Sequence, residues 1–139
     1  MKATELRIGN WVIHRSYFDD GHHGHYGGEH RRQVKMSLYL FNEIDNIEPI
    51  PLTEEWLEAF GFSLEGSEAG EDGCVELGAP NGGSKWYILI CPKPGKYVKS
   101  KGMWIQYNYH ESMTIPIPKY VHQLQNLYFA LTGEELEKK

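Results

Sequence analysis

Apolar and polar residues alternate along two segments near the start of the chain. In 11–14, Trp11 and Ile13 would face one side of an extended chain, and the residues between them the other. In 33–41, QVKMSLYLF, every second residue from Val34 to Leu40 is apolar. A period of two is typical of β-strands with one buried face. The pattern predicts two antiparallel strands joined by a glycine-rich segment, with a third short strand at 44–48.

Two other segments carry the spacing of amphipathic helices, and we expect helices at about 53–60 and 119–132. Thr53 is a good N-cap for the first helix, and Gly61 is a good stop. Its buried stripe is predicted to contain Trp56, Leu57 and Phe60. Gly133 ends the second helix, whose apolar face is predicted to contain Val121, Leu124, Leu127, Tyr128 and Leu131.

Short apolar runs predict further strands at 74–77, 86–91 and 103–109. Polar, glycine-rich or basic stretches predict flexible loops at about 19–31, 63–73 and 92–102, and the charged C-terminal tail is expected to fray. The sequence therefore predicts a single α+β domain over 1–139. We expect a small, mostly antiparallel sheet or barrel-like meander with two packed helices.

The composition is that of a globular domain, with 40% hydrophobic and 24% charged residues. A net charge of −5 argues against binding nucleic acid or an anionic membrane over the whole surface. No segment reaches the roughly 20 apolar residues that span a bilayer. Cys74 and Cys91 lie in apolar surroundings and are expected to be buried free thiols. A reducing cytoplasm is the expected compartment.

Three blocks of sequence resemble those of a family of short uncharacterised bacterial proteins, some from phage-like and other mobile elements. The blocks are ELRIGNWV, IEPIPLTEEWLEAFGF and KYVHQLQNLYFALTGEEL, and they occur in order from one end of the chain to the other. The resemblance implies a common fold. It implies no catalytic or binding residue, and the histidine-rich segment lies outside the three blocks.

The segment DDGHHGHYGGEH, residues 19–30, holds four of the seven histidines. Imidazole and carboxylate are the ligands that zinc takes from proteins, and glycines let a backbone wrap an ion. The candidate metal ligands are His22, His23, His25, His30 and Asp20. The alternative is a solvated hairpin tip without a resident cofactor, which binds zinc or nickel only adventitiously.

A basic loop followed by aromatic residues resembles a platform for single-stranded nucleic acid. The candidate residues are Lys93, Lys96, Lys99, Lys101 and Trp104. Aromatic residues on the next strand alternate between its two faces, which weakens this interpretation. Ordinary sheet packing beside a solvated loop is the alternative, and the acidic chain as a whole disfavours nucleic acid.

The last predicted helix has more apolar surface than one buried stripe needs. Tyr120, Tyr128 and Phe129 are the candidates for contact with a protein partner or a second copy of the chain. No strong catalytic constellation occurs, so the first hypothesis is a non-enzymatic binding or interaction module. The alternatives are a metal-binding protein or metal-dependent enzyme using the histidine-rich segment, and a nucleic-acid accessory protein using the basic loop.

Overall fold

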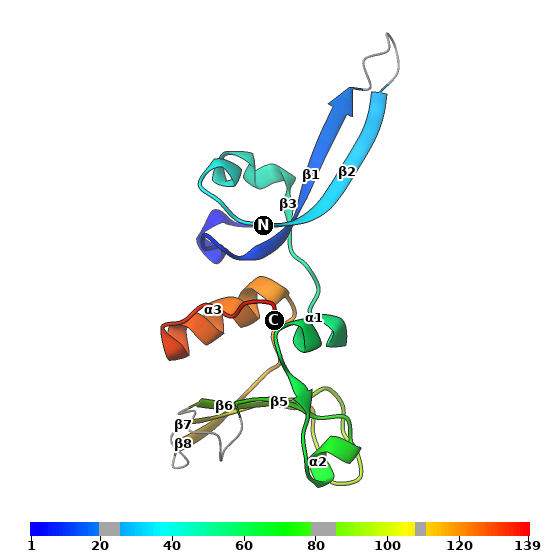
Figure 1. The fold of residues 1–139 in the computed structure, drawn as a ribbon, viewed down its shortest axis with the longest axis vertical. Helices are drawn as coiled ribbons and strands as arrows, with labels where there is room; N and C mark the ends of the chain where they lie inside the picture. Colours follow the sequence, from blue (N-terminus) through cyan, green and yellow to red (C-terminus); the bar gives the residue numbers. More distant parts are fainter. Residues whose placement is uncertain (20–25, 79–85, 108–110) are drawn as a thin grey trace. The chain divides into compact units, whose positions relative to one another are not determined.

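The computed structural model of the chain describes residues 1–19, 26–78, 86–107 and 111–139, and these form two compact units (Figure 1). Unit 1 comprises Met1–Leu52 and Lys119–Leu136, and unit 2 comprises Thr53–Pro118 and Glu137–Lys139. Both units contain helices and antiparallel strands, so the predicted α+β class is confirmed. The single domain expected over 1–139 stays a prediction.

Unit 1 contains a three-stranded antiparallel sheet in the order β2-β1-β3. Its strands are β1 (Trp11–Asp19), β2 (Tyr26–Lys35) and β3 (Ile47–Glu48). The predicted pairing of the first two strands is confirmed, with Trp11 opposite Lys35 (Figure 1). Much of the expected loop at 19–31 belongs to these two strands, which run as far as Asp19 and resume at Tyr26.

The strand predicted over 33–41 is wrong beyond Lys35. Residues after Met36 leave the sheet and enter a 3-10 helix, η2 (Tyr39–Asn46); a second, η1 (Ala3–Glu5), lies near the N-terminus. The alternation fails because Leu38 is 76% exposed, while Met36 and Leu40 are buried. Residues four positions apart, such as Met36 and Leu40, lie on the same face of a helix as well as on the same face of a strand. The resulting core cluster contains Leu6, Val12, Met36, Leu40 and Ile47, with Val34, Phe41 and Ile44 packed against it.

Helix α3 (Val121–Thr132) confirms the second predicted helix. It ends where Gly133 adopts a left-handed conformation, φ 74°, which glycine tolerates without a Cβ clash. An isolated bridge between Pro51 and Tyr120 places its start beside the end of the first segment of unit 1. The N–H of Val121 donates to the carbonyl of Ile50 at 2.9 Å.

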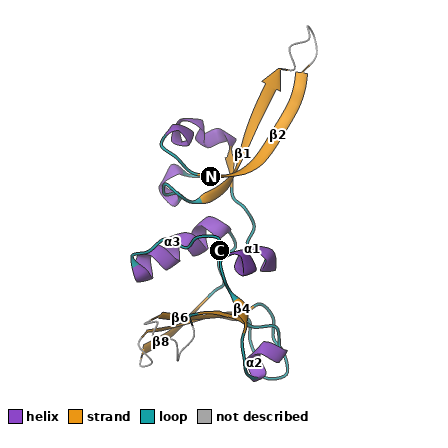
Figure 2. Ribbon diagram, in the orientation of Figure 1, coloured by secondary structure: helices purple, strands orange, loops and turns teal. Residues whose placement is uncertain are grey.

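Unit 2 is built on a five-stranded antiparallel meander in the order β4-β5-β6-β7-β8 (Figure 2). Its elements are α1 (Glu54–Ala59), β4 (Ser63–Leu64), α2 (Glu68–Glu71), β5 (Val75–Leu77), β6 (Trp86–Cys91), β7 (Gly102–Tyr107) and β8 (Glu111–Ile115). The interior side chains of the central strands β6 and β7 include Ile88, Ile90, Met103 and Ile105.

Two expectations for unit 2 are corrected by the structure. The segment 63–73, expected to be a loop, contains β4 and α2. The C-terminal tail, expected to fray, is held in place. Lys139 donates its N–H to the carbonyl of Ala59 at 2.8 Å, and the Lys138 ammonium lies 4.2 Å from the centre of the Trp56 ring. These contacts join positions about eighty residues apart, which composition alone does not reveal.

Candidate functional site

Local sequence signals bring helix α1 and strand β4 together. The Thr53 hydroxyl accepts the N–H of Trp56 at 3.4 Å and caps the start of α1. At its end Gly61 has φ 98°, a left-handed conformation that reverses the chain. The N–H of Phe62 then donates to the carbonyl of Leu57 at 3.0 Å. The chain therefore passes from α1 into β4 through a short turn over 60–62.

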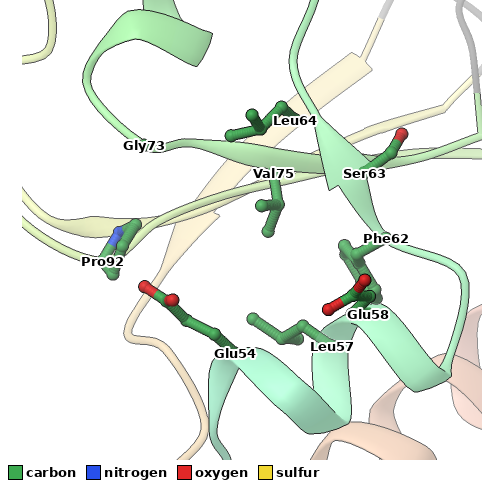
Figure 3. A pocket seen from close by; sticks show the side chains of 9 residues that line it. All are labelled: Glu54, Leu57, Glu58, Phe62, Ser63, Leu64, Gly73, Val75 and Pro92. Atoms are coloured by element: carbon green, nitrogen blue, oxygen red, sulfur yellow. The ribbon is translucent and has the colours of Figure 1, made fainter.

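A groove lies between α1 and the first strands of the sheet, with a volume of about 640 Å³ (Figure 3). In Figure 3, Val75 points from β5 toward Leu57, and Glu54 and Glu58 stand on either side of Leu57. Both glutamates are exposed to solvent. The lining residues are Glu54, Leu57, Glu58, Phe62, Ser63, Leu64, Gly73, Val75 and Pro92. The groove thus has apolar walls and two carboxylates.

A disulfide joins Cys74 to Cys91 beside this groove. Gly73 and Val75, which flank one cysteine, and Pro92, which follows the other, all line the groove. The expectation of two free thiols is therefore wrong. The sequence did not show that 74 and 91 fall opposite each other at the ends of two paired strands. Disulfides persist mainly in oxidising compartments, so the cysteines no longer support a cytoplasmic location.

The basic loop is organised by Asp72 from inside unit 2. Its carboxylate accepts backbone N–H groups from Lys96 at 2.8 Å and from Tyr97 and Val98 at 2.7 Å each. Burial acts to raise the pKa of Asp72, but the three N–H donors outweigh it, and the pKa lies below its ordinary value. The loop expected to be flexible is therefore anchored over 96–98.

The candidate nucleic-acid residues do not form one continuous platform. The side chains of all four candidate lysines are exposed, namely those of Lys93, Lys96, Lys99 and Lys101. Trp104 lies opposite Leu89 and helps to line a hollow of about 320 Å³ with Tyr97, Val98 and Lys99. Neighbouring strand positions point to opposite faces, so Tyr107, three residues further along β7, lies on the other face from Trp104. That face carries the Tyr107 contact with Trp86, with ring centroids 4.6 Å apart.

The candidate partner residues, Tyr120 just before α3 and Tyr128 and Phe129 on it, are each engaged within unit 1. The Tyr120 ring stacks on His122, with centroids 5.9 Å apart. Tyr128 is half-buried, and burial raises the pKa of its hydroxyl. Phe129 is 39% exposed, and the Arg7 guanidinium lies 4.1 Å from the centre of its ring. These three side chains therefore do not make one open apolar patch.

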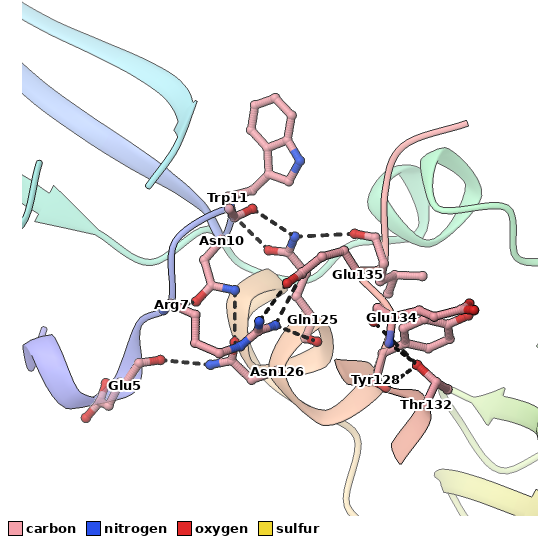
Figure 4. Close-up of polar contacts among 12 residues, drawn as sticks. Glu5, Arg7, Asn10, Trp11, Gln125, Asn126, Tyr128, Thr132, Glu134 and Glu135 are labelled. Atoms are coloured by element: carbon pink, nitrogen blue, oxygen red, sulfur yellow. Dashed lines mark hydrogen bonds and ion pairs between the residues drawn. The ribbon is translucent and has the colours of Figure 1, made fainter. Parts of the chain in front are cut away.

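A polar network ties the N-terminal segment to α3 (Figure 4). Arg7 donates to Asn126 Oδ1 at 2.8 Å and forms an ion pair with Glu135 at 2.7 Å. Asn10 donates to the same Asn126 oxygen at 2.9 Å. Gln125 accepts the N–H of Trp11 at 2.8 Å and is 2% exposed. Buried amides that satisfy one another in this way fix the position of a helix rather than bind a ligand.

His122 is the one buried histidine of the described chain, with 1% of its surface exposed. Neither ring nitrogen has a hydrogen-bond partner among the residues described. Burial lowers the pKa of His122, and the nearby charge of Glu5 only partly opposes it. Burial therefore favours the neutral form of the imidazole in the folded protein.

Most of the candidate metal ligands, namely Asp20, His22, His23 and His25, lie outside the described residues. His30 belongs to β2, opposite Ser16. Within the described ranges, no group of three or more His, Cys, Asp or Glu side chains is placed to hold a metal ion. No helix of the described chain is long and apolar enough to cross a membrane.

Comparison with protein families, curated proteins and solved structures gives no match for this chain. The resemblance of its three sequence blocks to a bacterial family therefore stays a prediction.

The groove was missed by sequence reasoning because its lining comes from four separate stretches of chain. One signal was present: Glu54 and Glu58 lie four residues apart on a helix, on either side of an apolar residue. That spacing places both carboxylates on one helix face. The sequence did not show which strand this face meets.

Proposed function

We propose that this protein is a non-enzymatic interaction module that binds a segment of a partner protein in the groove beside α1. The observation that carries the proposal is the groove itself, with apolar walls and an open carboxylate pair. Its volume of about 640 Å³ lies in the range of roughly 300–1,000 Å³ typical of ligand sites. This space suits one or two large apolar side chains of a partner.

The exposure of Leu64 supports binding rather than internal packing. Leu64 is 66% exposed, although it lies on a strand and lines an apolar groove. Leaving such a side chain in water loses the roughly 1.5–3 kcal/mol that its burial would contribute. A partner that covers Leu64 recovers part of this free energy, as exposed apolar patches at interfaces do.

The chemistry of the lining supports a non-enzymatic role. The only polar side chains among the lining residues are Glu54, Glu58 and Ser63. No histidine, cysteine, lysine or arginine of the described chain lines the groove, so no imidazole, thiol or amine lies beside Ser63 to activate it. Binding is the activity that these groups support best.

The test is selection of a displayed random-peptide library on the immobilised full chain. Selected peptides should bind wild type and a Leu38→Ser variant equally, and should bind a Leu64→Ser variant at least tenfold more weakly. Leu38 is the matched control because it is also exposed, at 76%, and belongs to unit 1. Peptides whose binding ignores Leu64→Ser, or a selection without enrichment, would contradict the proposal.

A further inference from the structure

The groove belongs to a strongly acidic stretch of chain. Residues 53–78 contain no lysine, arginine or histidine. The acidic residues of this stretch are Glu54, Glu55, Glu58, Glu65, Glu68, Glu71, Asp72 and Glu76. Such an excess of one sign attracts ligands of the opposite charge and repels those of the same charge.

Glu54 and Glu58 are left without a cation. Neither carboxylate has an ion pair or a hydrogen bond with any residue in the described ranges. Elsewhere the chain does pair its carboxylates: Glu135 lies 2.7 Å from Arg7, and Glu48 lies 3.2 Å from Arg15. Like charges four residues apart on a helix repel each other. A cation placed between Glu54 and Glu58 would relieve that repulsion.

Three lysines of unit 2 make contacts away from the two groove carboxylates. Lys138 lies over the Trp56 ring, and Lys99 donates to the carbonyl of Lys96 at 3.2 Å. Lys96 itself lies 5.1 Å from the centre of the Tyr97 ring. None of these three contacts involves Glu54 or Glu58, so both carboxylates remain open to a cation of a partner.

Strand β4 offers a backbone edge next to these carboxylates. It is the first strand of the sheet and pairs only with β5 among the described strands. Glu65 donates its N–H to the carbonyl of Cys74 at 3.0 Å. In an antiparallel pair only alternate residues exchange such bonds. Leu64 therefore directs its own N–H and C=O away from β5, toward the open edge.

From these observations we infer that the groove accepts an extended, cationic segment of a partner protein. The segment pairs its backbone with Leu64, places an apolar side chain against Leu57 and Val75, and places a lysine or arginine between Glu54 and Glu58. Strand addition of this kind takes its affinity from main-chain hydrogen bonds and its specificity from alternate side chains. The inference rests on the proposed function, because it specifies the partner of the same groove.

The test uses two fluorescent peptides, one alternating lysine and valine and the other alternating glutamate and valine. Anisotropy titration at low and high salt measures their binding to the full chain. Wild type should bind the lysine peptide at least tenfold more tightly, with less difference at high salt. The Glu54→Lys/Glu58→Lys variant should reverse the preference. Glu55→Lys is the matched control, because Glu55 is exposed on the same helix and does not line the groove.

The other outcomes separate this inference from the proposed function. If library peptides depend on Leu64 but lack basic residues, or the charge reversal leaves the preference unchanged, the groove binds segments and the inference of a cationic partner is wrong. If a lysine peptide with N-methylated backbone binds as well as the parent, strand addition is wrong. If sedimentation shows a dimer that Leu64→Ser dissociates, the occupant is a second copy and the inference fails. If no ligand depends on Leu64, both proposals fail.

Discussion

Reduction of the bond between Cys74 and Cys91 should lower the free energy of unfolding of unit 2 by about 3 kcal/mol. The two cysteines are 17 positions apart in the sequence. In the chain-entropy description, opening a loop of that length restores conformations to the unfolded chain and stabilises it. Small domains are stable by only about 5–15 kcal/mol, so the change is a large fraction of the total.

The assay is urea unfolding followed by tryptophan fluorescence, with and without a thiol reductant. Three of the four tryptophans, Trp56, Trp86 and Trp104, belong to unit 2 and report on it. With a slope of about 1–3 kcal/mol per molar urea, the loss moves the midpoint down by about 1 M or more. The Cys74→Ala/Cys91→Ala variant is the control, because its midpoint should not respond to reductant.

Two results would refute this reasoning at different points. Titration of two free thiols in the folded, unreduced protein would show that the bond does not form. A midpoint that stays fixed when mass spectrometry shows complete reduction would show that the bond forms but contributes no stability.

Three further predictions concern single side chains. Asp72→Asn replaces one acceptor oxygen with a donor, so trypsin should cut the 92–101 loop several-fold faster than in wild type, whereas the exposed neighbour Glu71→Gln should leave the rate unchanged. Burial lowers the pKa of His122 below 6.5, so its contribution to the free energy of unfolding should be complete above pH 6.5. Below pH 6.5 the histidine takes up a proton more readily in the unfolded chain, and stability should fall by at most about 1.4 kcal/mol per pH unit. His122→Phe should remove most of that slope, and an unchanged slope would assign it to another group. Gln125→Leu should cost about 1–3 kcal/mol in urea unfolding, because the partly buried N–H of Trp11 loses its acceptor. A wild-type midpoint would contradict this.

The parts of the fold that were predicted correctly are those with local causes. Thr53, Gly61 and Gly133 mark helix ends through their own backbone and side-chain chemistry, and all three do so in the structure. Strand β6 was predicted with the bounds that it has, because a short apolar run rich in β-branched and aromatic residues seldom suits anything else.

The failures have causes that lie far along the chain. Met36 and Leu40 fit both a strand and a helical turn, and only the core that they share with Leu6 and Ile47 decides between them. The tail is ordered by α1, and the pairing of the cysteines depends on the register of β5 and β6. The groove is the same kind of feature, because no single segment of its lining is unusual by itself.

The carboxylate of Asp72 has a consequence for the loop that it holds. Successive backbone N–H groups converging on one point are the concave arrangement in which many proteins hold phosphate. Here the protein supplies its own anion to that arrangement, from 24 to 26 positions earlier in the chain. The segment at 96–98 is therefore an anion receptor that is already filled. A phosphate drawn in by the surrounding lysines would find the backbone donors occupied, and it would have to displace a covalently tethered competitor to reach them.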